Sequence, residues 1–266
     1  MKKDNIWSDD SFVERLDKML KGRSKRLKDN IQYYGRGILV DMLLSAQKGD
    51  IILDIGCGEG DTIKKYQDQC SVIGIDISRK MCKEAKKNIS RGEIVMASME
   101  HLPFKDGVMD KVVAVYSIIY SPHKRKIMKE ISRILREKGE LVIYDPNRIS
   151  IRTLIRRLLC IKFSISGEKD DPKYIHHKIV TKQALSYFDF RNLGYEVNLN
   201  LVYWCGIFSI HTFLPSKIFS LIDKLGYKKW GNAPILKFFS DFLILKFVKD
   251  REKENCKEGR KEENVF

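Results

Sequence analysis

The chain has 266 residues, and its 50 lysines and arginines outnumber its 35 aspartates and glutamates, which gives a net charge of +15. This length suits one large α/β domain, and the charge favours acidic partners such as phosphorylated substrates, anionic lipid headgroups or RNA. The six cysteines contain no CxxC pair. The sequence therefore argues against a disulfide framework and predicts reduced thiols and no metal site.

The amino-terminal part is expected to be helical. Residues 1–35 carry mixed charges and apolar residues at helical spacing, and a second helix is predicted to end at Lys48-Gly49. The amino terminus turns acidic where a signal peptide would turn apolar, and no apolar run approaches the roughly 18 residues of a membrane span. We therefore expect a cytoplasmic protein.

From Asp50 onward the apolar residues change their period. Short apolar runs, each predicted to be a strand, alternate with amphipathic stretches of helical length. This alternation is typical of a parallel sheet built from βαβ units. The runs cover residues 51–55, 72–75, 94–96, 112–115 and 141–144.

The regularity weakens after the fifth predicted strand. Residues 148–163 carry five basic residues and no acidic one. As a basic amphipathic helix, this stretch could make peripheral contact with a membrane, or it could dock on its own domain with solvated arginines. The sequence leaves both interpretations open.

Residues 181–203 predict a helix, a turn at Asn192-Leu193-Gly194 and a strand from Tyr195 to Tyr203. An apolar and aromatic segment over residues 204–240 then leads into DFLILKFVKD. That run is short, β-like and bounded by charge, so we expect it to close the sheet. The tail over residues 251–266 is nearly all charged and is predicted to be solvated.

The stretch LDIGCGEG, residues 53–60, places three glycines directly behind the first apolar run. Glycine has no Cβ, so the backbone can turn tightly and approach a ligand. The dinucleotide pattern GxGxxG fails because Asp61 stands where the third glycine belongs, and no Gly-Lys-Ser/Thr follows to complete a Walker A loop. The loop therefore predicts a nucleotide-like ligand of another kind.

The second part of this predicted site is Asp76, which ends the next apolar run in VIGIDIS. A carboxylate at this place can accept hydrogen bonds from both hydroxyls of a ribose. Coupled to the glycines in one βαβ unit, Asp76 predicts that the ligand is a nucleoside with a free diol.

The motifs ILDIGCGEG, VIGIDIS, MEHLPF, DGVMDKVVAVYSI and EISRILREKGELVI stand in the order and at the spacing of the class I S-adenosylmethionine-dependent methyltransferases. Over residues 36–146 the chain resembles their UbiE-like, small-molecule branch. The resemblance implies an α/β, Rossmann-like fold with a seven-stranded, mostly parallel sheet and an antiparallel last strand. The domain would cover residues 36–250, with insertions at 148–180 and 204–240.

The resemblance also implies S-adenosyl-L-methionine as the cofactor. Asp76 would bind its ribose, Ile77 would cover an adenine face, and Tyr116 would join the cofactor site. Relatives carry an aspartate for the adenine amino group, where this chain has Ser98 and Met99, which can still offer a hydroxyl and a backbone N–H. The residues expected around the methionine part are Asp54, Gly56, Cys57, Gly58 and Gly60.

Two signatures of relatives are absent: the His-His pair after the fourth strand and the Asn/Asp-Pro-Pro-Tyr motif of amino-methylating enzymes. O- or C-methylation of a small or lipid-like acceptor, such as a glycan or a quinone precursor, is therefore favoured over N-methylation. Methyl transfer is an in-line displacement that needs a base only where the acceptor loses a proton. The candidate bases are Tyr120, His123 and His177, followed by His101 and His176.

Two other functions stay open. The charge of +15 motivates an RNA methyltransferase, although the basic residues are spread over several segments with acids nearby. The change at Ser98 and the missing His-His pair leave room for a non-catalytic partner subunit that binds S-adenosylmethionine without turnover.

Overall fold

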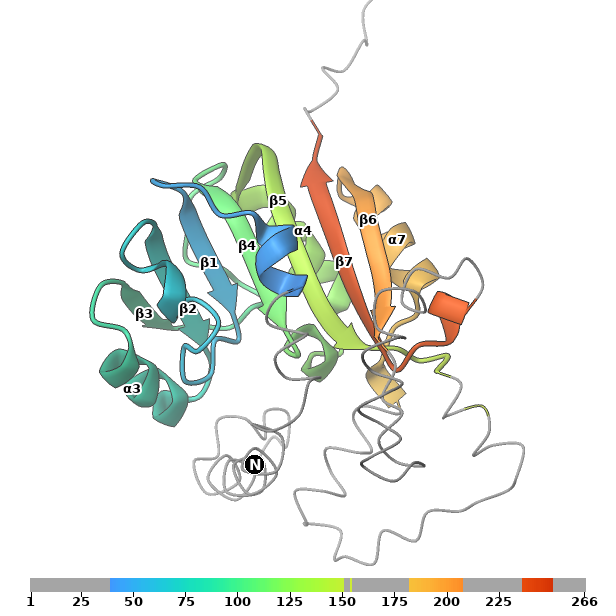
Figure 1. Cartoon of the computed structure of the whole chain (residues 1–266), viewed down its shortest axis with the longest axis horizontal. Helices are drawn as coiled ribbons and strands as arrows, with labels where there is room; N and C mark the ends of the chain where they lie inside the picture. Colours follow the sequence, from blue (N-terminus) through green and yellow to red (C-terminus); the bar gives the residue numbers. More distant parts are fainter. Residues whose placement is uncertain (1–38, 151–153, 155–181, 208–235, 251–266) are drawn as a thin grey trace, which may run out of the picture.

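A seven-stranded sheet forms the centre of the protein, as a computed structural model describes it over residues 39–150, 154, 182–207 and 236–250 (Figure 1). The strands stand in the order β3-β2-β1-β4-β5-β7-β6. Their bounds are β1 Ile51–Ile55, β2 Ser71–Asp76, β3 Glu93–Met96, β4 Met109–Val115, β5 Leu135–Pro146, β6 Leu199–Ile207 and β7 Phe242–Lys249. The α-helices are α3 Arg79–Asn88, α4 Lys124–Ile134 and α7 Tyr187–Glu196, and the 3₁₀ turns are η2 Lys64–Tyr66, η3 Ile118–Tyr120 and η5 Leu236–Phe239.

Strands β1 to β5 pair in parallel, whereas β7 runs antiparallel to both β5 and β6. The predicted seven-stranded, mostly parallel sheet with an antiparallel last strand is therefore confirmed. The carboxyl ends of β1, β2, β4 and β5 lie along one edge of the sheet, which is the lower edge in Figure 1. Open α/β sheets bind their ligands at this edge.

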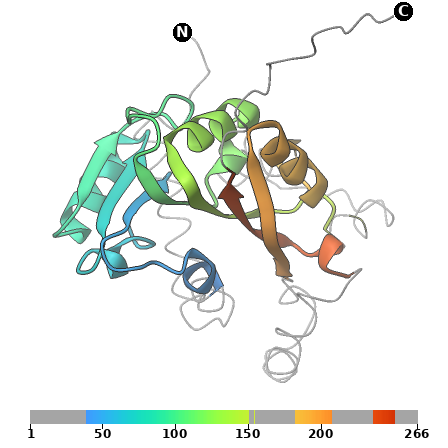
Figure 2. The ribbon, with the colours of Figure 1, turned by 90° about the horizontal axis from the view of Figure 1, so that it is seen from above.

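Helices cover both faces of the sheet. One face packs against α4 and α7, which lie together on the same side in Figure 2, and the other face packs against α3 and the helical residues 39–44. Successive residues of a strand alternate between the two faces, so Leu53 belongs to the first core cluster and Ile52 to the second. The site at the carboxyl edge thus rests on two fully packed layers.

Three predicted boundaries are wrong. The helix before β1 ends at residue 44 rather than at Lys48-Gly49, and the link between β1 and β2 contains only η2. The predicted turn at Asn192-Leu193-Gly194 lies inside α7. A Cβ on Gly194 would come within 2.6 Å of the Phe247 Cε1 atom, so this glycine lets the helix approach the sheet. The chain turns at Asn198, with φ 59°, and β6 begins one residue later.

Asn147, which follows β5, ties together three segments that are far apart in the sequence. Its backbone forms a parallel bridge with Leu185, and its N–H donates to the Asp241 carbonyl at 2.9 Å. Its side-chain amide donates to the carbonyl oxygens of Phe238 and Ser240, each at 2.8 Å. The described residues on either side of 151–181 and of 208–235 therefore lie close together.

Residues 1–35 and 251–266, and most of the stretches 148–163 and 204–240, lie outside the described residues. The predicted domain boundaries and the predicted membrane contact of 148–163 therefore stay predictions. In the part of the chain that the structure describes, no helix is both long and apolar enough to cross a membrane.

Candidate functional site

The glycine loop after β1 forms the first wall of the site. Gly56 has φ 72°, and a Cβ there would lie 2.6 Å from the Ser117 Cβ. Only glycine fits this left-handed, crowded position, so the loop approaches the segment that follows β4. Gly58 has φ 54°, and a Cβ there would meet no atom within 4 Å. The loop is therefore crowded on the side of β4 and open at Gly58.

Asp76, at the end of β2, anchors this loop. Its carboxylate accepts hydrogen bonds from the backbone N–H of Gly58 at 3.0 Å and of Ser78 at 2.8 Å. Burial raises the pKa of Asp76, and these backbone donors act against that shift. Ile77 follows at the same edge and is half-buried. Asp76, which is predicted to bind the ribose, therefore lies beside the glycine loop, which is predicted to bind the methionine part.

Asp54, in β1 beneath the loop, is 1% exposed, and neither of its carboxylate oxygens has a hydrogen-bond partner among the described residues. Burial first, and then the nearby Asp76 carboxylate, raise the pKa of Asp54 to about 8. A buried carboxylate without a donor is unfavourable, so this position suits a ligand that brings positive charge. The loop residue Cys57 is also buried, and burial raises the pKa of its thiol.

The segment after β3 reaches the same edge. The Ala97 N–H donates to the Asp76 carbonyl at 3.1 Å, and the Ser98 hydroxyl accepts from the Glu100 N–H at 3.2 Å. Met99 is half-buried and packs against the core under α4. Ser98 and Met99 therefore lie next to Asp76, as an adenine-binding role requires, although that role itself stays a prediction.

Aromatic side chains form the opposite wall, at the ends of β4, β5 and β7. The Tyr116 ring centroid lies 6.0 Å from that of Tyr120 and 6.0 Å from that of Phe242, and Tyr144 stacks on Phe242 at 5.2 Å. Tyr116 has φ 55°, and its N–H donates to the Tyr144 carbonyl at 2.6 Å. We call Tyr116, Tyr120, Tyr144 and Phe242 the aromatic wall.

The histidine candidates lie elsewhere. His123 is the exposed residue that precedes α4, and its side chain caps no N–H of that helix. His101 is exposed, and its Nε2 lies 2.5 Å from the Lys126 Nζ. His176 and His177 lie outside the described residues. Of the candidate bases that the structure describes, only Tyr120 belongs to the aromatic wall.

Two buried ionisable residues near Tyr120, Lys124 and Asp145, were not predicted to belong to the site. Lys124 is 8% exposed and donates from Nζ to the carbonyls of Ser121 at 2.5 Å and Ile119 at 3.3 Å. Asp145 is 1% exposed in β5. Burial lowers the pKa of Lys124 to about 8 and raises that of Asp145 well above its usual range. The pKa of Tyr120 is raised by burial, and also by Tyr116 and Asp145.

One signal could have identified Asp145: like Asp54 and Asp76, it is an acidic residue near the end of an apolar run. Lys124 had none, because it stands among other basic residues. Within the described ranges, no group of three histidine, cysteine, aspartate or glutamate side chains is arranged to hold a metal ion. The site therefore combines a glycine loop, the buried carboxylates of Asp54 and Asp145, the half-buried carboxylate of Asp76 and an aromatic wall.

Comparisons with known proteins agree on one type of domain. A family model described as "Methyltransferase domain" matches residues 53–143. The uncharacterized protein MJ0638 of Methanocaldococcus jannaschii is 31% identical over 208 residues, which cover 77% of this chain and 80% of that protein. The demethylmenaquinone methyltransferase of Thermotoga maritima is 28% identical over 110 residues, which cover 40% of this chain and 48% of that protein.

Among solved structures, a chain of the complex between the Haloferax volcanii Trm112 methyltransferase activator and a methyltransferase matches with a TM-score of 0.62. The sequences are 16% identical, and the match covers 90% of this chain and 98% of that chain. At this identity the likeness concerns the fold.

Proposed function

Because the chain belongs to the class I S-adenosylmethionine-dependent methyltransferases, we propose that it methylates a small, lipid-like acceptor at oxygen or carbon, with the acceptor bound against the aromatic wall. The observation that carries this proposal is the wall itself. Planar or isoprenoid groups pack well on aromatic rings. The similarity to a demethylmenaquinone methyltransferase supports an acceptor of this type.

The glycine loop and the buried carboxylates fit S-adenosylmethionine. Asp54 lacks a hydrogen-bond partner among the described residues, and the cofactor carries both an ammonium group and a sulfonium. Asp76, fixed by two backbone N–H groups, keeps lone pairs for the ribose hydroxyls. When bound, the cofactor supplies an activated methyl group. The residues that would hold it are Asp54, Gly56, Gly58, Gly60 and Asp76.

The contact between Gly56 and Ser117 joins the two halves of the site. Ser117 precedes η3, which carries Tyr120. A cofactor on the glycine loop would therefore lie close to an acceptor on the aromatic wall. Holding two reactants in line at near-contact distance supplies most of what this displacement needs.

For a hydroxyl acceptor, Asp145 is the proposed proton acceptor. The Asp145 carboxyl is 1% exposed, and burial raises its pKa well above the usual range. The Tyr120 ring lies 6.0 Å from the Tyr116 ring, and Asp145 contributes to the raised pKa of Tyr120, so Tyr120 is the residue proposed to orient the acceptor. The Asp145 carboxylate would accept the proton of the acceptor hydroxyl, and the bound cofactor would supply the methyl group and leave as S-adenosylhomocysteine.

Methyl-labelled S-adenosylmethionine, incubated with the purified chain and a total cell extract, tests the proposal. Label should appear in the fraction soluble in organic solvent, together with S-adenosylhomocysteine. Label confined to RNA would overturn the lipid-like acceptor, and absence of S-adenosylhomocysteine would favour a non-catalytic partner subunit. Asp76→Ala is the control, because it removes the ribose ligand and should abolish labelling.

A further inference from the structure

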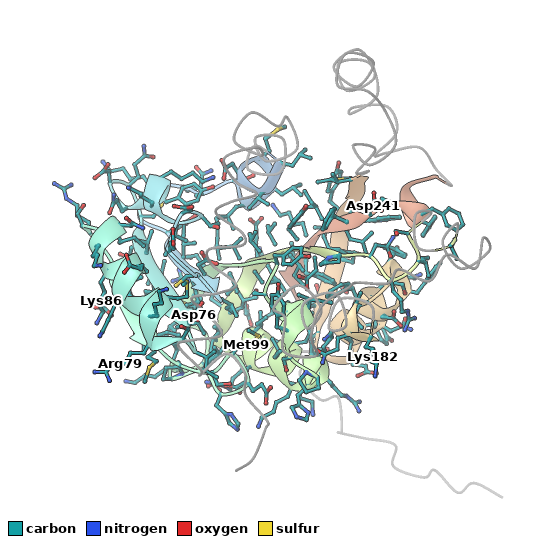
Figure 3. The ribbon with its side chains drawn as sticks, turned by 90° about the horizontal axis from the view of Figure 1, so that it is seen from below. Asp76, Arg79, Lys86, Met99, Lys182 and Asp241 are labelled. Atoms are coloured by element: carbon teal, nitrogen blue, oxygen red, sulfur yellow. The ribbon has the colours of Figure 1, made fainter. Side chains whose placement is uncertain are left out.

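The outer side of α3 carries a dense group of positive charges. Cys82, Ala85 and Ile89 face the sheet and are buried, so the remaining side of the helix faces solvent. The only acid in the helix is Glu84. Figure 3 shows Arg79 and Lys86 at the outer edge of the molecule, farther out than Asp76. We call the five basic residues the α3 face: Arg79, Lys80, Lys83, Lys86 and Lys87.

The charges of this face are mostly uncompensated. Lys87 pairs with Glu84 at 2.8 Å, but the other four form no ion pair with any described residue. Three arginines of and near α4 differ, because acids neutralise them: Arg125 pairs with Glu196, Arg133 with Glu130 and Asp106, and Arg136 with Asp110. Uncompensated charges on one surface attract an extended anionic partner.

The shape and composition of the face distinguish between anionic partners. Single-stranded nucleic acids bind in grooves with aromatic side chains on which bases stack. The α3 face is the convex side of a helix and contains no aromatic residue. Lysines near an anionic bilayer each contribute to binding without any groove. The neighbouring edge strand β3 adds the apolar side chain of Met96, which is 61% exposed.

We propose that the α3 face docks this protein on anionic lipid bilayers. The helix begins three residues after Asp76, at the carboxyl edge of the sheet. Docking would therefore place the cofactor end of the site next to the bilayer. The attraction is electrostatic, so it weakens as salt rises. The proposal does not depend on the identity of the acceptor, because a protein that methylates a water-soluble molecule could dock in the same way.

Co-sedimentation of the full chain with vesicles tests the docking. Vesicles of phosphatidylglycerol and phosphatidylcholine in equal parts should bind the protein, and vesicles of phosphatidylcholine alone should not. The triple variant Arg79→Gln, Lys83→Gln, Lys86→Gln should bind the anionic vesicles roughly a hundredfold more weakly, since each lysine near such a surface contributes about fivefold. High salt should release the wild-type protein.

The matched control removes three exposed lysines from other surfaces: Lys105→Gln, Lys129→Gln, Lys138→Gln. It has the same net charge as the α3 variant and should keep most of the binding. Circular dichroism and thermal melting should show that both variants fold. Equal losses in the two variants, unchanged binding of the α3 variant, or α3-dependent binding to ribosomal RNA that exceeds binding to vesicles would each overturn the proposal.

Discussion

The carboxyl ends of β1 and β2 and those of β4 and β5 form two halves of one site, built by different means. At β1 and β2, backbone conformation makes the site: left-handed glycines and N–H groups that fix Asp76. At β4 and β5, side chains make it: the aromatic wall, Lys124 and Asp145. The β1 and β2 half requires glycines at fixed spacing, so it can be recognised as a sequence motif. The β4 and β5 half can be built from many residue types, so it cannot.

The largest effect is expected from Gly56→Val, which tests whether the β1 half depends on its backbone. The new side chain would meet the Ser117 Cβ at 2.6 Å in a backbone with φ 72°, a strain of about 1–3 kcal/mol. Calorimetry should detect no binding of S-adenosylhomocysteine. Gly58→Ala is the control, because its backbone is also left-handed, with φ 54°, but a Cβ there meets no atom within 4 Å, so it should lose less affinity. Equal losses in both variants would show that the contact with Ser117 does not matter.

Asp145→Asn tests whether the β5 half contributes chemistry. With a hydroxyl acceptor, turnover should fall roughly a hundredfold or more, because the amide cannot accept the proton. The affinity for S-adenosylhomocysteine should stay within about twofold, since Asp145 does not touch the glycine loop in this scheme. The wild-type rate should rise with pH through the pKa of Asp145, and the variant should lack this rise. A fall in cofactor affinity of the same size would assign Asp145 a structural role.

Asp76→Asn tests the side chain that is proposed to bind the ribose in the β1 half. The amide keeps the shape of the carboxylate but loses charge-assisted hydrogen bonds, each worth about 1.5–3 kcal/mol. Calorimetry should show binding of S-adenosylhomocysteine weakened roughly tenfold to a hundredfold. Unchanged affinity would mean that the ribose lies elsewhere.

The smallest effect concerns the stability of the cofactor-free protein. The pKa of Asp54 is raised from 3.8 to about 8 in the folded state. The folded protein therefore holds a proton that the unfolded chain releases, and stability is lost as pH rises from about 4 to about 8. Asp54→Asn should lose less stability over this range in thermal melting, yet bind S-adenosylmethionine more weakly. If the melting temperatures of the wild type and of Asp54→Asn changed equally with pH, the raised pKa of Asp54 would be contradicted.

The difference between the halves also explains what the sequence could predict. The apolar runs predicted β1 to β5 and β7, glycine spacing together with Asp76 predicted a nucleoside ligand, and the family resemblance then implied S-adenosylmethionine. The boundary between α7 and β6 was missed, because Gly194 looks like a turn residue until Phe247 is placed beside it. Asp145 and Lys124 were missed because their burial depends on contacts between β5 and α4, which are distant in sequence. Local patterns do not encode such contacts.

The backbone bridge and hydrogen bonds of Asn147 have a consequence for how this fold can change. The described residues on either side of 151–181 and of 208–235 lie close to this residue. A closed loop loses little free energy when it lengthens, about 0.6 kcal/mol for each doubling. The contacts of Asn147 hold the described ends of both stretches in place, so the sequence between these ends can change in length at little cost to the cofactor half.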